Sequence, residues 1–217
     1  MGSSSESDAR QALVEVGRRL YETGMIVAAE GNLSLRLDAG RILVTPSGIS
    51  KGRMGPDDLV VVDAQGKHLQ GRLRATSELL MHLSVYERRP EIAACVHSHA
   101  PYATAFAAVG EPLPEHVLPE MVQFVGGIPL TEYAPPGTAA VPQSLEPYLA
   151  DHDAFLLRNH GLLTVGTTLD DAYSRHERVE HYARIIWLAR QLGTPAPLAA
   201  AEVDRLNQLR RKQQWVE

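Results

Sequence analysis

The sequence predicts one α/β domain built on a mixed or antiparallel sheet. Segments with helical periodicity alternate with short apolar runs and hairpins along the 217 residues. No internal repeat or long linker divides the chain, and its length is sufficient for one substantial core. We therefore expect a single domain over residues 9–217. The Ser-rich residues 1–8 are expected to be a disordered end or an expression remnant.

The first third of the chain is predicted to hold one helix followed by short strands. Apolar residues at 13, 16 and 20 predict an amphipathic helix over residues 9–24, which ends at a glycine. Residues 28–37 pass from a glycine turn into alternating leucines, and residues 41–48 form a short strand that breaks at a Pro-Ser-Gly turn. Residues 59–69 have the pattern of a hairpin around a Gln-Gly or Gly-Lys turn.

Helices and strands alternate in the rest of the chain. A helix over residues 77–89 can be capped by Thr76 or Ser77 and stops at a proline. It is followed by a strand ending in histidines at 92–101, a helix at 101–109, a Pro- and Gly-rich stretch at 111–142 with a short strand near 128–133, a strand at 155–158 that leads into 159–165, the longest helix at 170–192 and a terminal helix at 200–216.

The composition is that of an ordinary globular protein, with 44% hydrophobic and 22% charged residues. A formal net charge of −5 without a long basic run argues against nucleic acid as a partner. No stretch approaches the roughly 18 apolar residues of a membrane helix, so no membrane partner is expected. A single cysteine excludes an internal disulfide and predicts a cytoplasmic location.

Two histidines end the apolar stretch from Ile92 to Pro101. Side chains two residues apart in a strand point to the same side, about 6.6–6.8 Å apart. His97 and His99 are therefore expected to emerge together where Pro101 stops the strand. Imidazoles are good zinc ligands, and two on one strand form half a site. The His-X-His pattern alone is weak evidence, and a pair of ordinary buried or surface histidines is the alternative.

A third histidine and a carboxylate can complete a metal shell. His160 follows a predicted strand in the sequence Asn-His-Gly-Leu-Leu, where Gly161 permits a close approach of the backbone. Glu78 lies in the expected first turn of a helix, where a carboxylate also interacts favourably with the helix dipole. Three histidines and one carboxylate suit a tetrahedral divalent ion, and the carboxylate can leave when a substrate arrives.

Three turns in the first eighty residues present small residues, hydroxyls and backbone amides. They are Gly-Asn-Leu-Ser at 31–34, Thr-Pro-Ser-Gly at 45–48 and Thr-Ser at 76–77. Such turns can hold phosphate oxygens without steric obstruction. Taken singly, each of them is more often an ordinary turn.

The order of these motifs resembles the class II (zinc-dependent) aldolase/adducin family. The sequences GNLS, TPSG, TSE, VHSHAP, YAPPGT and NHGLL occur in the family's order over about residues 10–195. The resemblance implies a three-layer α/β/α fold with a central, mainly antiparallel sheet. It also implies a homotetramer with active sites at the subunit interfaces.

The resemblance also assigns roles to individual residues. It implies His97, His99 and His160 as ligands of Zn²⁺, or of Mn²⁺ or Co²⁺. Glu78 is implied as a further ligand in the empty site and as an acid/base during turnover. The implied phosphate-binding positions are Gly31, Asn32, Ser47, Gly48, Thr76 and Ser77.

These roles lead to a hypothesis about the reaction. We expect an aldolase that cleaves a ketose 1-phosphate, of the fuculose type or of the deoxy- or methylthio-ribulose type, to dihydroxyacetone phosphate and an aldehyde. The metal acts as a Lewis acid for an enediolate, the phosphate cradle orients the substrate, and Glu78 moves a proton. A Schiff-base lysine is the metal-free alternative, but Lys51 and Lys67 lie in predicted polar turns.

Two departures from the family pattern keep other reactions open. Glu120 occupies the position where the fuculose-phosphate type has a catalytic tyrosine, and it is predicted to be a second acid/base or else a solvated carboxylate. No tyrosine follows Tyr182, so the family's C-terminal catalytic tyrosine is missing, and Trp215 is a candidate cover for the site. A methylthioribulose-phosphate dehydratase, a ribulose-phosphate 4-epimerase and an adducin-like assembly domain are the alternatives, although Glu78 favours the aldolase. Apolar residues beside Glu120 hint at a less hydroxylated aldehyde; they are Val117, Leu118, Val122 and Phe124.

The remaining polar candidates are assigned ordinary roles. The two histidines of residues 176–181 (HERVEH) are five apart, about 140° around a helix, so they do not form a zinc-protease motif. We expect them at the surface or at an interface. His82 is expected to pack or to pair with Glu78, and Cys95 to be a small buried thiol. Tyr133 is expected to anchor its loop.

Overall fold

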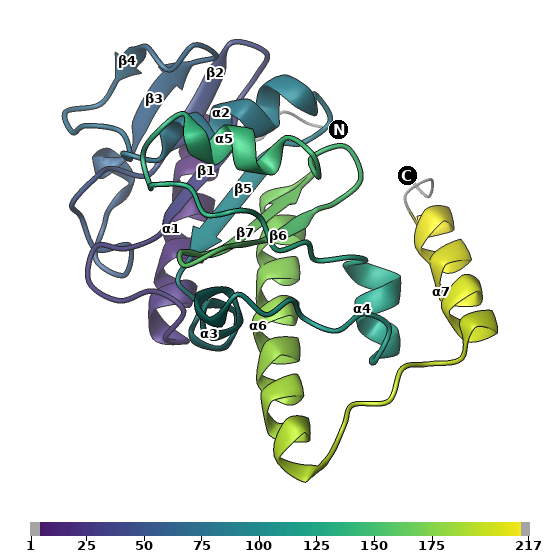
Figure 1. Ribbon diagram of the computed structural model, residues 1–217. Coiled ribbons are helices and arrows are strands. Elements are labelled where there is room, and N and C mark those ends of the chain that lie inside the picture. Colours follow the sequence, from purple (N-terminus) through teal and green to yellow (C-terminus); the bar gives the residue numbers. More distant parts are fainter. Residues whose placement is uncertain (1–4, 214–217) are drawn as a thin grey trace.

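The computed structural model is a three-layer α/β/α fold around one seven-stranded sheet (Figure 1). It describes the backbone of residues 5–213 and the side chains of residues 5–211. The strands follow the order β4-β3-β2-β1-β5-β7-β6, and every neighbouring pair is antiparallel. The predicted α/β class is confirmed, and the sheet is antiparallel rather than mixed.

The elements are α1 (Glu6–Glu22), β1 (Asn32–Arg36), β2 (Arg41–Val44), η1 (Pro56–Asp58), β3 (Val60–Asp63), β4 (His68–Gln70), α2 (Leu79–Arg88), β5 (Ala94–Ser98), α3 (Pro101–Val109), α4 (Pro119–Phe124), α5 (Ala140–Leu145), β6 (Ala154–Leu157), β7 (Gly161–Gly166), α6 (Leu169–Leu192) and α7 (Ala200–Gln213).

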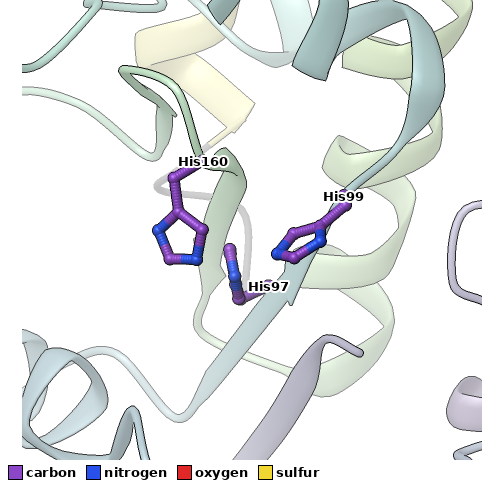
Figure 2. A group of neighbouring side chains, drawn as sticks. All are labelled: His97, His99 and His160. Carbon is purple, nitrogen blue, oxygen red and sulfur yellow. The ribbon is translucent and has the colours of Figure 1, made fainter. Parts of the chain in front are cut away.

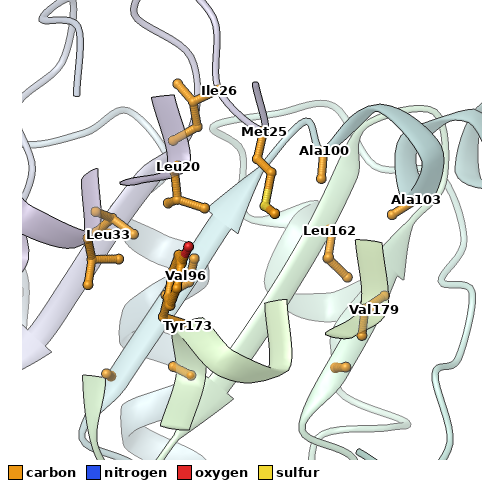
Figure 3. Packing of buried hydrophobic residues seen from close by; sticks show 14 of the residues in the cluster. Leu20, Met25, Ile26, Leu33, Val96, Ala100, Ala103, Leu162, Tyr173 and Val179 are labelled. Atoms are coloured by element: carbon orange, nitrogen blue, oxygen red, sulfur yellow. The ribbon is translucent and has the colours of Figure 1, made fainter. Parts of the chain in front are cut away.

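Each face of the sheet has its own hydrophobic core, because successive strand residues point to opposite faces. Val96 of β5 lies on the face covered by α1, α3 and α6, in one cluster with Leu20 and Tyr173 (Figure 3). Its neighbour Cys95 lies on the opposite face, in a cluster with Val85 of α2 and residues of α5. Both β5 and β7 are buried along their whole length, as expected for strands in the interior of a three-layer fold. The two cores hold the end of β5 rigidly between them.

Helix α1 begins at Glu6, three residues earlier than predicted. The Ser5 hydroxyl accepts the backbone N–H of Asp8, and the Asp8 carboxylate accepts the backbone N–H of Ser5. This reciprocal pair stabilises the first turn of the helix. Residues 5–8 are therefore the cap and first turn of α1, while residues 1–4 lie outside the described part of the chain.

The strand predicted near 128–133 is not formed; α4 lies before this position, and α5 begins at the end of the Pro- and Gly-rich stretch. Leu130 forms only an isolated bridge with Leu156 of β6. The backbone N–H and C=O of Leu156 both hydrogen-bond with this segment, so the segment covers one edge of the sheet. At the opposite edge, β4 has three residues and a register shift interrupts its pairing with β3.

The C-terminal helix α7 stands beside α4, away from the sheet (Figure 1). Val122 of α4 packs with Val203 and Leu206 of α7 in a small third cluster. Trp215, the candidate cover for the site, lies outside the described residues. The longest helix is α6, and neither it nor any other helix within residues 5–213 is long and apolar enough to cross a membrane.

Candidate metal and anion site

Three histidines converge at the end of the central strand β5. His97 is the penultimate residue of β5, His99 lies just beyond it, and His160 lies in the turn between β6 and β7. Figure 2 shows the three rings pointing toward one another from these two segments. The ring centroids are 4.6 to 5.4 Å apart, and one nitrogen of each ring lies within 4.8 Å of the others. One metal ion could therefore contact all three rings.

The turn that carries His160 approaches β5 so closely that only glycine fits at its end. A Cβ atom on Gly161 would lie 2.5 Å from the carbonyl oxygen of Ser98 and 3.0 Å from the ring of His99. Asn159 has a φ of 54°, which asparagine adopts more readily than most residues, and its amide donates to the carbonyl of Ala108. The close approach predicted for Gly161 is confirmed.

The hydrogen bonds of the rings leave nitrogen lone pairs facing the cluster. His97 Nδ1 is 2.9 Å from the carbonyl oxygen of Leu162, which can only accept, so Nδ1 carries the proton. Its buried Nε2 faces the cluster, with a carboxylate oxygen of Glu78 at 3.2 Å. His99 Nδ1 is 3.1 Å from a carboxylate oxygen of Glu30, which leaves its Nε2 for the cluster. Imidazoles held by carbonyl and carboxylate groups in this manner are the usual ligands of zinc-like ions, so the donor set fits a divalent metal.

Glu78, directly before α2, lies beside the histidines. Its carboxylate oxygens are 3.1 Å from His160 Nε2 and 3.2 Å from His97 Nε2, and Asn32 Nδ2 donates to it at 2.8 Å. Burial raises the pKa of the Glu78 carboxyl, but the adjacent rings of His160 and His97 outweigh burial, and the pKa lies well below its usual range. Glu78 is thus a buried, ionised carboxylate that a metal at the histidines would meet.

All six residues predicted to bind an anion line one hollow of about 250 Å³ beside the histidines. The residues around it are Ala29, Glu30, Gly31, Asn32, Ser47, Gly48, Lys51, Thr76, Ser77, Glu78, His99, Pro136 and His160. Gly31 has a φ of 67°, and a Cβ atom there would lie 2.8 Å from the carbonyl oxygen of His97. The three turns that the sequence suggested as anion cradles therefore meet at one place, next to the histidine cluster.

Lys51, predicted to lie in a polar turn, also lines this hollow. Only 2% of its surface is exposed, and its Nζ donates to the carbonyl of Ala29 at 2.7 Å. Burial lowers the pKa of Lys51 to about 8. Lys51 does lie in a turn, but it is buried because its segment packs under α1: a Cβ atom on Gly17 would lie 3.0 Å from the Lys51 carbonyl. The sequence gives one local signal, since Lys51 closely follows the Thr-Pro-Ser-Gly turn.

A chain of buried hydrogen bonds extends from Glu78 into the core. The Asn32 amide group donates to Glu78, so its oxygen accepts from His82 Nε2 at 2.5 Å. His82 Nδ1 then accepts from the Ser34 hydroxyl, and Ser34 accepts from the hydroxyl of Tyr86, each at 2.6 Å. His82 therefore contacts Glu78 through Asn32 rather than directly. Burial lowers the pKa of His82 to about 3, so the ring is neutral and the direction of every bond in the chain is determined.

His176, expected at the surface or at an interface, is fully buried on the face of β5 opposite to the His97 side chain. Its Nε2 is 2.6 Å from the hydroxyl of Ser98, which lies between the two strand histidines. One turn further along α6, the Glu180 carboxylate accepts the backbone N–H groups of Tyr102 and Ala103, 2.9 Å each, at the start of α3. The expectation failed because the alternation of β5 turns Ser98 toward α6. The pair from α6 holds the turn that carries His99.

Glu120 and Tyr133 are exposed and do not line the hollow. Glu120 lies in α4, which Figure 1 places away from the end of β5. Within the described chain it makes no hydrogen bond or ion pair with the histidines. Tyr133 is 56% exposed, and its role as an anchor of its loop stays a prediction. Val122, part of the apolar hint beside Glu120, packs against α7 instead. Cys95 is a buried thiol as predicted, and burial raises its pKa to about 12.

Comparisons with known proteins agree with this geometry. The sequence model of the family described as "Class II Aldolase and Adducin N-terminal domain" matches residues 11–187. The chain is 36% identical to a 3-oxo-tetronate 4-phosphate decarboxylase of Haemophilus influenzae over 82% of this chain and 86% of that protein. It is 33% identical to a 5-methylthioribulose-1-phosphate/5-deoxyribulose-1-phosphate aldolase of Rhodospirillum rubrum, over 91% of this chain and 88% of that protein.

A solved structure gives the same picture of the fold. An L-fuculose 1-phosphate aldolase superposes with a TM-score of 0.87 at 33% identity. The match covers 95% of this chain and 97% of that one. The similarity therefore includes both layers of helices and the sheet that carries the histidines.

Proposed function

The chain belongs to the class II aldolase and adducin family and is an enzyme of the class II aldolase type, and we propose that it cleaves a ketose 1-phosphate reversibly to dihydroxyacetone phosphate and an aldehyde. The family depends on a divalent metal, and we propose Zn²⁺, Mn²⁺ or Co²⁺ at His97, His99 and His160. The single observation that carries the proposal is that the anion turns line one hollow with Glu78 and with His99 and His160, two members of the histidine cluster. A methylthio- or deoxy-ribulose phosphate and fuculose phosphate are the proposed substrate types, after the names of the relatives.

The proposed cleavage breaks the bond between the third and fourth carbons of the ketose. The electron pair stays on the third carbon and spreads to the neighbouring carbonyl oxygen. The hydroxyl of the fourth carbon loses its proton and becomes the aldehyde, and a proton added to the third carbon completes dihydroxyacetone phosphate. A divalent ion at the histidines would supply positive charge against the negative charge that develops on the substrate oxygens.

The residues of the chain divide the remaining tasks between two ends of the substrate. We propose that Gly31, Asn32, Ser47, Gly48, Thr76 and Ser77 hold the phosphate, so that binding energy remote from the reacting carbons orients them. Glu78 is ionised and next to the histidines, so it can accept the proton that the substrate loses and return it to the third carbon. Glu120 lies outside the hollow of its own chain, and we propose that it serves the hollow of a neighbouring copy in a homotetramer.

The decarboxylase among the relatives favours a second candidate function. Loss of the carboxyl group from a 3-oxo-tetronate 4-phosphate leaves the same three-carbon ketone phosphate, dihydroxyacetone phosphate. The electron pair stays on the carbon next to the ketone in both reactions. Carbon dioxide needs no proton removed as it leaves, whereas the aldehyde does. The two candidates therefore differ in the departing fragment and share the phosphate end, and the motifs of the sequence do not separate them.

One experiment tests both candidates. The metal-loaded protein is incubated with a panel of ketose 1-phosphates and with 3-oxo-tetronate 4-phosphate, and dihydroxyacetone phosphate, aldehyde and carbon dioxide are all measured. The proposal predicts equal amounts of dihydroxyacetone phosphate and aldehyde from a ketose 1-phosphate. Carbon dioxide in place of aldehyde supports the decarboxylase. A changed sugar without dihydroxyacetone phosphate supports the dehydratase or 4-epimerase. A protein that changes none of these substrates and is unaffected by chelators supports an adducin-like assembly role.

The cytoplasmic location stays a prediction, and fractionation of cells tests it.

A further inference from the structure

Lys51 is a buried cation that has no carboxylate partner in the described part of the chain. Only 2% of the residue is exposed. Its Nζ donates one hydrogen bond, to the neutral carbonyl of Ala29. Within residues 5–211 Lys51 forms no ion pair, and the nearby carboxylates Glu30 and Glu78 lie against histidines instead. A buried charge without a partner is costly, so proteins normally pair it. An ammonium group has three N–H donors, and Ala29 takes only one of them.

The position of Lys51 shows what kind of partner is missing. Its side chain lines the hollow together with Ser47, Gly48, Thr76 and Ser77, the hydroxyl and glycine residues of two anion turns. Glu78, the buried carboxylate of the hollow, is already held by Asn32 and two histidines. Hydroxyls and glycine amides suit phosphate oxygens, but in the hollow they provide no positive charge. Lys51 supplies a positive charge on the side of these turns.

We propose that Lys51 binds the phosphate group of the substrate and is its counter-charge in the hollow. This inference rests on the proposed function, because it assumes that the hollow receives the phosphate of a sugar ester. A charge-assisted hydrogen bond from the ammonium to phosphate is about twice as strong as a neutral one. Burial lowers the pKa of Lys51 to about 8, so the group is mostly protonated at neutral pH and ready to accept an anion.

Two other roles of Lys51 make different predictions. The lysine could serve only as a brace for the turn at Ala29, which carries Glu30 and hence the hydrogen bond to His99. In that case its removal should weaken metal binding. It could also form a Schiff base with the ketone, in which case borohydride should trap the substrate on Lys51.

The test compares Lys51→Gln and Lys51→Met with wild type. Gln removes the charge but keeps an N–H for Ala29, whereas Met removes both. Lys67→Met is the matched control, because Lys67 is exposed in the β3–β4 turn. Calorimetry measures the Kd of inorganic phosphate for the Co²⁺-loaded protein, and chelator competition measures Co²⁺ affinity. Steady-state kinetics give KM and kcat with a ketose 1-phosphate and with the unphosphorylated ketose.

We expect both Lys51 variants to raise the phosphate Kd and the KM of the phosphorylated ketose about 10- to 100-fold. Co²⁺ affinity and turnover of the unphosphorylated ketose should change little, and Lys67→Met should match wild type. Unchanged phosphate binding in Lys51→Gln overturns the proposal. So does a loss of Co²⁺ affinity that parallels the loss of phosphate, or borohydride trapping at Lys51. If no ketose phosphate is cleaved by wild type, the proposed function fails, and the phosphate Kd still decides the role of Lys51.

Discussion

Glu78 accepts a hydrogen bond from Asn32 and lies beside two histidines, and these neighbours determine what its replacement should do. We expect Glu78→Gln to lower kcat on the order of 10²- to 10⁴-fold, because the amide cannot carry a proton. The fold should persist, because the amide oxygen can still accept from Asn32. Steady-state kinetics and circular dichroism measure the two effects, with the exposed Glu87→Gln as control. Undiminished turnover in Glu78→Gln contradicts its assigned role.

His82 and His176 predict a dependence of stability on pH. Burial lowers the pKa of each ring to about 3 in the folded protein, against about 6.5 in an unfolded chain. Between these values the unfolded state binds more protons than the folded one. Stability therefore falls as the pH drops from about 7 toward 4, by up to roughly 1.4 kcal/mol per pH unit for each ring.

Urea unfolding at pH 7, 6 and 5 tests this prediction. His176→Gln should flatten the dependence on pH, because it removes one of the two buried rings. His181→Gln should leave the slope unchanged, because His181 is exposed on the same helix. Equal slopes for wild type and His176→Gln would show that the buried ring does not contribute.

The residues of the site differ in how far the sequence could predict them. His97, His99 and His160 stand next to glycine, proline or a strand end, and those local signals suffice to bring them to notice. Lys51 stands in an ordinary polar turn, and its burial depends on the packing of α1 against it, far away in the sequence. The partners of His176 are likewise set by the register of β5 against α6 rather than by its own neighbours.

At the scale of the elements, α6 contributes a pair of side chains to the site without lining it. Glu180 caps the start of α3 and His176 bonds to Ser98, so both act on the turn that carries His99. We expect Glu180→Gln to destabilise the protein by about 1–2 kcal/mol, because an amide offers one acceptor oxygen to two N–H groups.

The same substitution should also weaken Co²⁺ binding about tenfold if α6 positions His99. Chelator competition measures this effect, and Glu87→Gln is again the control. A loss of stability with unaltered Co²⁺ affinity would limit Glu180 to a structural role.

The long helices were predictable: apolar periodicity marks α1, and α6 is a long run without glycine or proline that ends at Gly193. The short helices α4 and α5 were not, since six residues form no stable helix by themselves and depend on tertiary contacts. The early start of α1 was missed because its capping pair uses Asp8 where Glu or Gln is the usual signal.

At the scale of the whole molecule, the histidine cluster should link metal binding to global stability. A ligand that binds only the folded state at a hundred times its Kd stabilises it by about 2.7 kcal/mol. We expect a chelator to lower the melting temperature and Zn²⁺, Mn²⁺ or Co²⁺ to restore it. His99→Ala should remove this response, and the exposed His181→Ala should keep it. Differential scanning calorimetry makes the measurement, and a melting temperature that no metal or chelator alters contradicts the site.

The order of motifs along the chain was enough to predict the layers of the fold and the neighbourhood of the site. It could not place α7, whose contacts with α4 involve three apolar residues without a distinctive pattern. Nor could it supply the contacts of Glu120, because its proposed target lies in another copy of the chain.

The two edges of the sheet have a consequence for how copies of the chain can meet. One edge is hidden beneath the segment around Leu130, and the other is a three-residue strand with disturbed pairing. Exposed strand edges are the usual templates for fibrous growth and for uncontrolled association. Neither edge here offers a long, regular row of free backbone groups. Any association between copies should therefore be limited and closed, with side chains of helices and loops forming the contacts.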